Sequence, residues 1–452
     1  MKIIIVGCGN VGTALVTRLS AEGHDITVID EEQPVVTAAV NNNDAMGIVG
    51  NGASFETLKE AGISDADLMI AVTDSDERNL LCCLIARKAG GCHTIARVRN
   101  PIYRKEISFI KEELGLSMII NPEEAAANDA ARLLKFPSAN KIEPFAGGRA
   151  ELVRMTLTPD SRLCDKTLAQ IQAEYKSSVL IAVVDRGEET IIPNGSFVLR
   201  AGDDISIIGA SRAIAGLFRK LSLPTARVHS TLIVGGGDTG FYLAKQLISF
   251  GIELKIFEKD NDRCKELTEL LPEALIINAD GTDRDMLMEE GITGIDSFVA
   301  LTNLDEENIM LSLYVKSVAP KAKLITRVHR VNYSEIIGSM GLGSILYPRN
   351  ITADRIVQYV RGMAGSIGSS VERLYKMSDG RAEAMEFLVR DGAGVCGIPL
   401  SELKLKDGVL IALISRKGEI ISPNGQSVIL PGDSVVVITG DIGCKNIVDI
   451  LR

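Results

Sequence analysis

The chain has 452 residues, 46% of them hydrophobic, which is enough for about three globular domains with sizeable cores. A formal net charge of −10 disfavours nucleic acid or anionic lipid as the main partner, although a local basic patch stays open as an alternative. No stretch approaches the roughly 18 apolar residues of a membrane span, and the eight cysteines lack a CxxC pair, which predicts buried thiols in a reducing cytosol rather than disulfides or a zinc site.

The chain begins with an aliphatic run and a glycine-rich turn, IIIVGCGNVG. Short apolar runs then alternate with longer segments of helical period. Continuous apolar strands separated by helices indicate a parallel sheet covered on both faces. The predicted strands are residues 3–6, 26–29, 47–49, 68–72, 95–98 and 118–120.

A second, smaller region follows. A helix is predicted after Pro122, because proline and two acidic residues suit its first turn. Residues 137–148 are rich in Pro, Gly and small residues and predict a linker. From there to about Leu223 the strands alternate, with hairpin turns expected at residues 194–195 and 202–203. This part predicts a small α+β domain.

The whole pattern then repeats. Gly7 and Gly235 are 228 residues apart, AVTDSDERN recurs 229 residues later as ALTNLDEEN, and PNGSFVLRAGD recurs after 230 residues as PNGQSVILPGD. A nearly constant offset indicates tandem duplication of a unit of about 225 residues. We therefore predict an α/β protein with two Rossmann-like parallel-sheet domains, each followed by a small α+β domain. The expected limits are 1–137, 143–225, 229–365 and 369–452.

The first glycine loop has the context of a dinucleotide-binding fingerprint, because it follows a strand, opens a helix and precedes an acidic residue at the end of the next strand. Gly7 would allow a tight turn, Gly9 the approach of a pyrophosphate, and Gly12 close packing of the helix. Asp30 would bind an adenosine ribose and repel a 2′-phosphate, which favours NAD(H) or an adenine nucleotide over NADP(H). A turn that only packs a helix is the alternative.

Further candidate contacts lie at the ends of neighbouring strands, since ligands of open α/β sheets bind beyond the carboxyl ends. They are Asn51, Gly52 and Ala53 at the adenine pocket, and Thr73 and Asp74 near the ribose and phosphates. Arg97 could equally contact a ligand or face solvent.

The second site departs from the first in two ways. Asp238 stands where the first loop has Asn10, and a carboxylate beside a phosphate weakens binding unless a cation intervenes. Glu258 replaces Asp30 and is followed by Lys259, which blurs discrimination against a 2′-phosphate. We expect the second site to be weaker or differently selective, with an empty site as the alternative.

No catalytic set is evident. A dehydrogenase needs a proton donor near the nicotinamide, yet His24 and His229 fall in loops, and His93 and His329 are expected before or within the fifth strands as structural residues. The acids of SDERN and LDEEN could hold a cation, but acidic first turns also stabilise helices. The pattern favours a sensor, with an NAD-dependent oxidoreductase and a ligand-independent scaffold as alternatives.

The ordered set IIIVGCGNVG, ITVID, GNGAS, AVTDSDERN and IARV resembles the regulator of potassium conductance domains, and its double copy resembles the Trk-type potassium uptake regulatory proteins over the whole chain. The resemblance implies a cytosolic homotetrameric subunit at the inner face of the membrane that binds NAD(H) or ATP/ADP and gates an integral membrane potassium transporter. It places nucleotide contacts at Gly7, Cys8, Gly9, Asn10, Val11, Asp30, Asn51, Thr73, Asp74 and Arg97 in the first copy, and at Gly235, Gly236, Gly237, Asp238, Thr239, Glu258, Asp280, Thr302 and Asn303 in the second. The predicted sites also include the glycines Gly12, Gly240 and Gly281.

The helices that follow Pro122 and Pro348 carry an apolar stripe. We expect them to form dimer contacts that shift when a nucleotide binds, because a ligand moves a two-state assembly by its difference in affinity for the two states. Ordinary core helices are the alternative.

Overall fold

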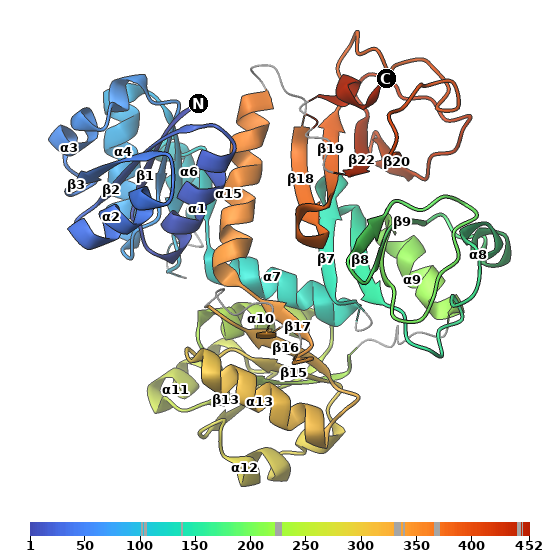
Figure 1. The fold of residues 1–452 in the computed structure, drawn as a ribbon. Helices are drawn as coiled ribbons and strands as arrows, with labels where there is room; N and C mark the ends of the chain where they lie inside the picture. Colours follow the sequence, from blue (N-terminus) through green and yellow to red (C-terminus); the bar gives the residue numbers. More distant parts are fainter. Residues whose placement is uncertain are drawn as a thin grey trace.

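The computed structural model describes residues 1–100, 103, 106–136, 139–221, 228–329, 336–337, 340–365, 371–440, 444 and 446–452. In this part of the chain two parallel sheets alternate with two antiparallel sheets, so the predicted tandem α/β architecture is confirmed (Figure 1). None of the described helices is long and apolar enough to cross a membrane.

The first parallel sheet has the strand order β3-β2-β1-β4-β5-β6, and each predicted strand lies within two residues of the observed one. The inner strands are buried on both faces, which explains their continuous apolar runs. The elements are β1 (Lys2–Val6), α1 (Asn10–Ala21), β2 (Asp25–Asp30), α2 (Gln33–Asn41), β3 (Ala45–Val49), α3 (Phe55–Glu60), β4 (Leu68–Ala71), α4 (Asp76–Gly90), β5 (His93–Arg97), α6 (Ile107–Glu113), β6 (Met118–Ile120) and α7 (Pro122–Lys135).

The second parallel sheet repeats this order as β14-β13-β12-β15-β16-β17. Its elements are β12 (Ser230–Val234), α10 (Asp238–Ser249), β13 (Glu253–Glu258), α11 (Asn261–Leu270), β14 (Leu275–Asn278), α12 (Arg284–Glu289), β15 (Ser297–Ala300), α13 (Asp305–Val318), β16 (Lys323–Arg327), β17 (Ser344–Leu346) and α15 (Pro348–Gly365).

The two small domains are five-stranded antiparallel sheets with the orders β10-β9-β11-β8-β7 and β18-β19-β22-β20-β21. The first contains β7 (Lys141–Phe145), β8 (Ala150–Thr156), α8 (Leu168–Tyr175), β9 (Leu180–Arg186), β10 (Glu189–Ile191), β11 (Asp204–Ala210) and α9 (Ser211–Lys220). The second contains β18 (Val371–Met377), β19 (Ala382–Leu388), β20 (Val409–Arg416), β21 (Glu419–Ile421) and β22 (Ser434–Gly440), and its described residues form no α-helix.

Two local predictions in the first small domain are wrong. The segment predicted as a linker contains the strand β7. Its Pro144 does not prevent strand formation, because β7 is an edge strand, where a missing N–H is tolerated. The turns at residues 194–195 and 202–203 connect β10 to β11, which do not pair, so neither is a hairpin turn; the hairpin joins β9 to β10.

The predicted domain limits are not settled by these elements. The limit at residue 143 falls inside β7, and those at 137, 225 and 369 lie outside the described residues. The four limits therefore stay a prediction.

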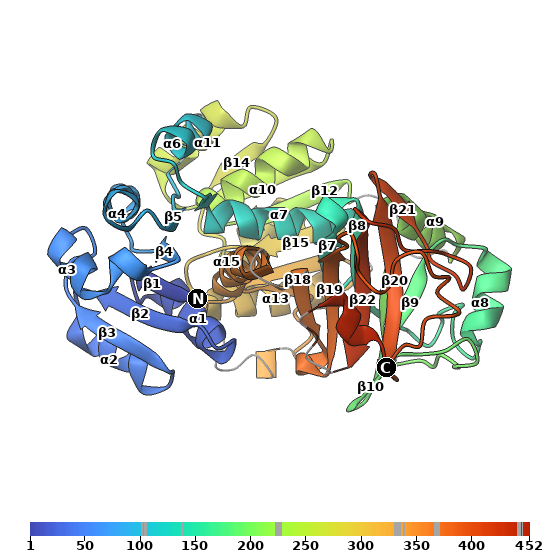
Figure 2. The same cartoon turned by 90° about the horizontal axis from the view of Figure 1, so that it is seen from above.

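The two Rossmann-like units exchange their last helices. Helix α7 follows the first sheet but packs against α10 of the second unit, where Ala130 and Leu243 share one core. Helix α15 follows the second sheet but packs against α1, where Ile356 and Leu15 share another. Both views show α15 beside α1 and α7 beside α10 (Figures 1 and 2). The helices thus join two units of one chain, and their predicted contacts with a second chain stay a prediction.

The two small domains also pack on each other. Phe145 and Val183 of the first sheet share a core with Met377 and Val436 of the second. Strands β7 and β8 therefore lie near β18 and β19, which continue from the exchanged helix α15 (Figure 1). The two repeats of the chain therefore pack against each other in both their Rossmann-like units and their small domains.

Candidate nucleotide-binding sites

The first glycine loop is shaped by steric limits at two of its three glycines. Gly7 has a φ of +96°, and a Cβ atom there would lie 2.8 Å from the Thr73 amide nitrogen. A Cβ atom on Gly12 would lie 1.9 Å from the Gly7 carbonyl oxygen. Gly9 is different, because a Cβ atom there would meet nothing within 4 Å. The loop therefore needs Gly7 and Gly12 to fold, whereas Gly9 leaves free space.

The second loop has the same geometry. Gly235 has a φ of +109°, a Cβ atom on Gly240 would lie 2.3 Å from the Gly235 carbonyl oxygen, and Gly237 has open space. Gly9 and Gly237 are the N-caps of α1 and α10, and neither helix has a side-chain cap. Uncapped first-turn N–H groups beside open space can accept an anion.

The acidic residue at the end of each second strand braces its loop. Asp30 accepts hydrogen bonds from the amides of Cys8 at 2.7 Å and Glu32 at 3.1 Å. Glu258 accepts them from Gly236 at 2.8 Å and Asp260 at 2.9 Å. Both carboxylates thus lie against the glycine loops, where a bound ribose is expected in this fold.

Three predicted contacts have side chains that point into the core. Cys8, Val11 and Thr239 are buried beneath their loops, so only their backbone can meet a ligand. Burial, with a smaller contribution from the charge of Asp30, raises the pKa of Cys8 to about 12. This thiol therefore stays protonated.

The turns after the third strands pack against the first strands. A Cβ atom on Gly52 or Gly281 would lie 2.2 Å from a methyl group of Val6 or Val234. Asn51 Oδ1 accepts a hydrogen bond from the Ala53 amide at 2.8 Å, and Asp280 holds its own turn in the same way. These residues shape the edge of the site.

An asparagine that the sequence did not single out holds each fourth strand to the fifth. Asn79 accepts the Thr73 amide at 2.8 Å and donates to the Arg97 carbonyl at 2.9 Å. Asn308 does the same for Thr302 and Arg327 at 2.9 and 3.0 Å. The available signal was the recurrence of this residue at the end of both SDERN and LDEEN.

Arg97 faces the interior rather than solvent. Its side chain is 17% exposed, its Nη2 lies 3.9 Å from Glu123 Oε1, and the nearby Asp74 carbonyl is held by Arg99. In the second unit Arg327 donates to Asn303 Oδ1 at 2.8 Å. Burial lowers the pKa of both arginines and raises the pKa of Glu123. Arg327 and Glu123 were not among the site residues predicted from the sequence.

Several buried polar side-chain atoms have no hydrogen-bond partner within the described ranges. They are Arg97 Nε, Glu123 Oε2, Arg327 Nε and Arg349 Nε. A buried donor without a partner is costly unless a ligand or water completes it. The arginine donors therefore fit an anionic ligand at the edges of the two sheets.

One acid of each of the segments SDERN and LDEEN, Asp76 or Asp305, has a structural role. Asp76 accepts the amides of Arg99 and Asn100 at 2.8 and 2.7 Å. Asp305 accepts the amide of His329 and lies 2.9 Å from its Nδ1. His329 follows β16 instead of preceding or lying within it, which corrects the predicted position. No group of three His, Cys, Asp or Glu side chains in the described part of the chain could hold a metal ion.

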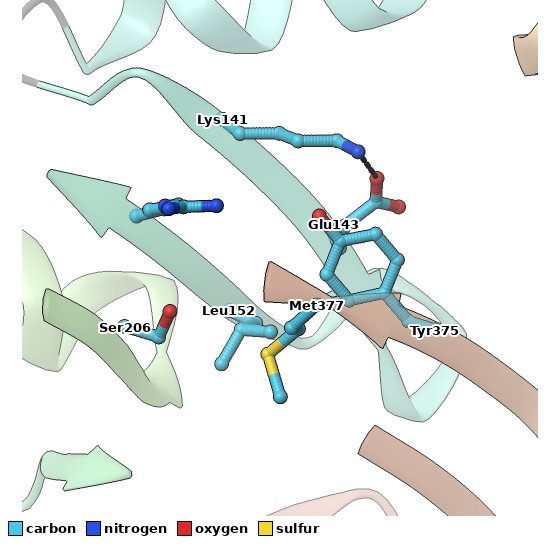
Figure 3. A pocket seen from close by; sticks show the side chains of 7 residues that line it. Lys141, Glu143, Leu152, Ser206, Tyr375 and Met377 are labelled. Atoms are coloured by element: carbon cyan, nitrogen blue, oxygen red, sulfur yellow. Dashed lines mark ion pairs between the residues drawn. The ribbon is translucent and has the colours of Figure 1, made fainter. Parts of the chain in front are cut away.

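A charged cleft lies between β7 and β18, away from the glycine loops. Lys141, Glu143, Leu152, Arg154, Ser206, Tyr375 and Met377 line it (Figure 3). Lys141 Nζ lies 3.6 Å from Glu143 Oε1 and 4.7 Å from the centre of the Tyr375 ring. Burial raises the pKa of Glu143 to about 7, opposed by Lys141 and reinforced by Asp129 and Asp354. The cleft therefore contains a carboxyl that titrates near neutral pH.

Family models match both repeats. The TrkA-N domain matches residues 3–122 and 231–348, which contain the two parallel sheets. The TrkA-C domain matches residues 152–222 and 384–443, which contain most of the two antiparallel sheets. The matches therefore follow the order of the four observed domains.

Relatives are similar over nearly the whole chain. The Trk system potassium uptake protein TrkA homolog 2 of Methanosarcina mazei is 32% identical over 445 residues, which is 97% of each chain. The TrkA protein of Haemophilus influenzae is 32% identical over 451 residues, covering 98% of this chain and 96% of its own.

Solved structures show the same fold. The GsuK channel bound to NAD has a TM-score of 0.64 and 16% identity, with coverage of 97% of this chain and 76% of the channel. The GsuK RCK domain has a TM-score of 0.63 and 16% identity, with coverage of 97% and 92%.

Proposed function

The chain belongs to the TrkA family, and we propose that it is a nucleotide-sensing regulatory subunit of a membrane potassium-uptake system. One observation carries the proposal: each loop has open space at the glycine directly before an uncapped helix, Gly9 or Gly237. This space and the free N–H groups suit the pyrophosphate of a nucleotide.

The proposed ligands are NAD(H) or ATP/ADP. The bound nucleotide would supply a phosphate anion and a ribose. The N–H groups at the starts of α1 and α10 would bind the phosphates, and Asp30 and Glu258 would accept ribose hydroxyl groups. GsuK structures of the same fold are described as bound to NAD and to ADP, which supports this choice.

The helix exchange supplies a route from each nucleotide to the opposite small domain. Helix α1 starts at the first loop and packs on α15, which leads into β18. Helix α10 starts at the second loop and packs on α7, which leads toward β7; Gln246 of α10 donates to Asn128 of α7 at 2.7 Å. Coupling of about 1–3 kcal/mol between such sites is typical.

We further propose that the chain forms a homotetramer that docks on an integral membrane potassium transporter at the inner face of the membrane. Support comes from the names of the relatives, which are components of Trk potassium uptake systems. The nucleotide would act by shifting the assembly between two states rather than by turnover.

Calorimetric titration of the full chain with NAD⁺, NADH, ATP and ADP tests the proposal. We expect saturable binding without product formation, together with a nucleotide-dependent change in potassium flux when the transporter is reconstituted with the chain. Steady oxidation of NADH with a small substrate would favour the oxidoreductase. Absence of binding by all four nucleotides would overturn the proposal.

A further inference from the structure

A cation on α11 contacts the second glycine loop, and the corresponding position of the first unit has no cation. Arg263, on α11, donates from Nε to the Gly236 carbonyl at 2.9 Å, and its Nη2 lies 3.2 Å from Asp238 Oδ1. Arg263 thus contacts both the backbone of the loop and the acid at the start of α10, and its Nη1 also donates to Glu266 Oε2 on α11 at 2.7 Å. Its side chain is 20% exposed, and that of Asp238 is 39% exposed.

The first unit has no equivalent pair. The residue at the position of Asp238 is Asn10, and the residue at the position of Arg263 is Val35. The uncharged Asn10 does not need a cation. The acid and the arginine therefore occur together in the second unit, and both are absent from the first.

The two contacts of Arg263 act in the same direction on a phosphate. The ion pair offsets the negative charge that Asp238 presents to an anion at the start of α10. The hydrogen bond from Arg263 also offsets the partial negative charge of the Gly236 carbonyl oxygen. Without the guanidinium, both groups would oppose an incoming phosphate.

We propose that Arg263 is a positioning residue that allows the second loop to bind a nucleotide despite Asp238, and that the pair makes this site prefer a dinucleotide to a nucleoside triphosphate. The preference follows from charge, because the residual repulsion from Asp238 grows with the charge of the phosphate chain. The inference rests on the proposed function, since it requires a nucleotide at the second loop.

The test uses the full chain with Gly9→Val, so that only the second site is read. Four variants are compared in this background by calorimetry with NAD⁺ and ATP: Arg263→Gln, Asp238→Asn, the double variant, and Lys265→Gln. Lys265 is a matched control because it lies on the same helix and pairs with Asp262 instead of the loop.

We expect Arg263→Gln to weaken ATP binding about tenfold and NAD⁺ binding about threefold, since a partly exposed charge pair has a modest effect. Asp238→Asn should strengthen ATP binding more than NAD⁺ binding. The double variant should bind ATP more tightly than Arg263→Gln but less tightly than Asp238→Asn, because the Gly236 carbonyl still loses its partner. Lys265→Gln should bind as the Gly9→Val parent does.

Each other outcome overturns the inference. It is wrong if Arg263→Gln binds as Lys265→Gln does, or if removing Asp238 does not restore binding. Thermal unfolding of each variant shows whether the chain is folded. If the Gly9→Val chain binds neither ligand while the unmodified chain binds one, the second site is empty, and only this inference fails. Absence of binding by the unmodified chain would instead overturn the proposed function.

Discussion

The two Rossmann-like units share their scaffold and differ in the charges next to it. Both have the same strand order, a first glycine with positive φ, a glycine with open space directly before the first helix, and an asparagine that joins the fourth strand to the fifth. The residues at the start of the first helix and on the second helix differ: Asn10 and Val35 in the first unit, Asp238 and Arg263 in the second. The residues that determine the backbone shape of the loop are therefore the same in both units, whereas the residues that determine the charge next to the loop differ.

The same contrast extends to the starts of the exchanged helices. Glu123, the second residue of α7, lies beside Arg97. Arg349 is the second residue of α15, which follows β17, and β17 pairs with the strand that contains Arg327. An acid and an arginine thus meet in the first unit, where two arginines have the corresponding positions in the second. The charges at the starts of the two exchanged helices therefore differ.

The largest expected effect tests the shared scaffold. Gly12→Ala and Gly240→Ala should each destabilise the chain by about 3 kcal/mol, because the new Cβ atom overlaps the carbonyl of the first loop glycine. Urea unfolding of the two variants checks this. Gly216→Ala is the control, since its Cβ atom has free space. If only one of the two variants lost stability, the two loops would not be structurally equivalent.

The next effect separates binding from folding. Gly9→Val and Gly237→Val should each reduce nucleotide affinity at their own site about 100-fold and change stability little, because the side chain enters open space where a pyrophosphate is expected. Calorimetry with NAD⁺ and ATP measures each remaining site alone. Equal affinities and equal preferences at the two sites would contradict the charge difference between the units.

The shared scaffold could be predicted because its causes are local. Buried parallel strands require continuous apolar residues, and the glycine spacing reflects atomic overlaps within one turn. Even so, the strand β7 was not predicted, because it contains Pro144 and the sequence does not show which strand lies at the edge of a sheet.

The contacts that distinguish the sites could not be predicted in this way. Arg263 is 27 residues from Gly236, and nothing in its helical pattern shows that it turns toward the loop. Helices α7 and α15 carry apolar stripes, but a stripe does not state which sheet it covers. Such contacts depend on how distant segments pack, and hydrophobic burial has no direction.

A smaller effect compares the two halves of the small-domain pair, where Glu143 of β7 lies near Tyr375 of β18. Because the pKa of Glu143 is raised from 4.5 to about 7, the folded chain binds its proton more tightly than the unfolded chain does. Stability from this group is therefore full below about pH 4.5 and is lost as the pH rises to about 7.

Glu143→Gln should remove that loss and stabilise the chain at pH 8 by about 2 kcal/mol, less than the full shift because the side chain is 27% exposed. Thermal unfolding between pH 5 and pH 8 measures the effect. Glu419→Gln, an exposed change in the other small domain, is the control. Parallel pH profiles for the unmodified chain and Glu143→Gln would show that another group controls this range.

The smallest expected effect tests whether the two exchanged helices transmit their signals separately. Asp354 of α15 pairs with Arg18 of α1, and both are partly exposed, so Asp354→Lys should cost less than about 1 kcal/mol of stability. It should still change how nucleotide at the first site alters hydrogen exchange in β18, because it reverses a charge between α1 and α15. Gln246→Ala, which removes the contact of α10 with Asn128, should instead affect β7 when the second site fills. If each variant alters both strands equally, the exchanged helices act as one body, and the two sites do not signal separately.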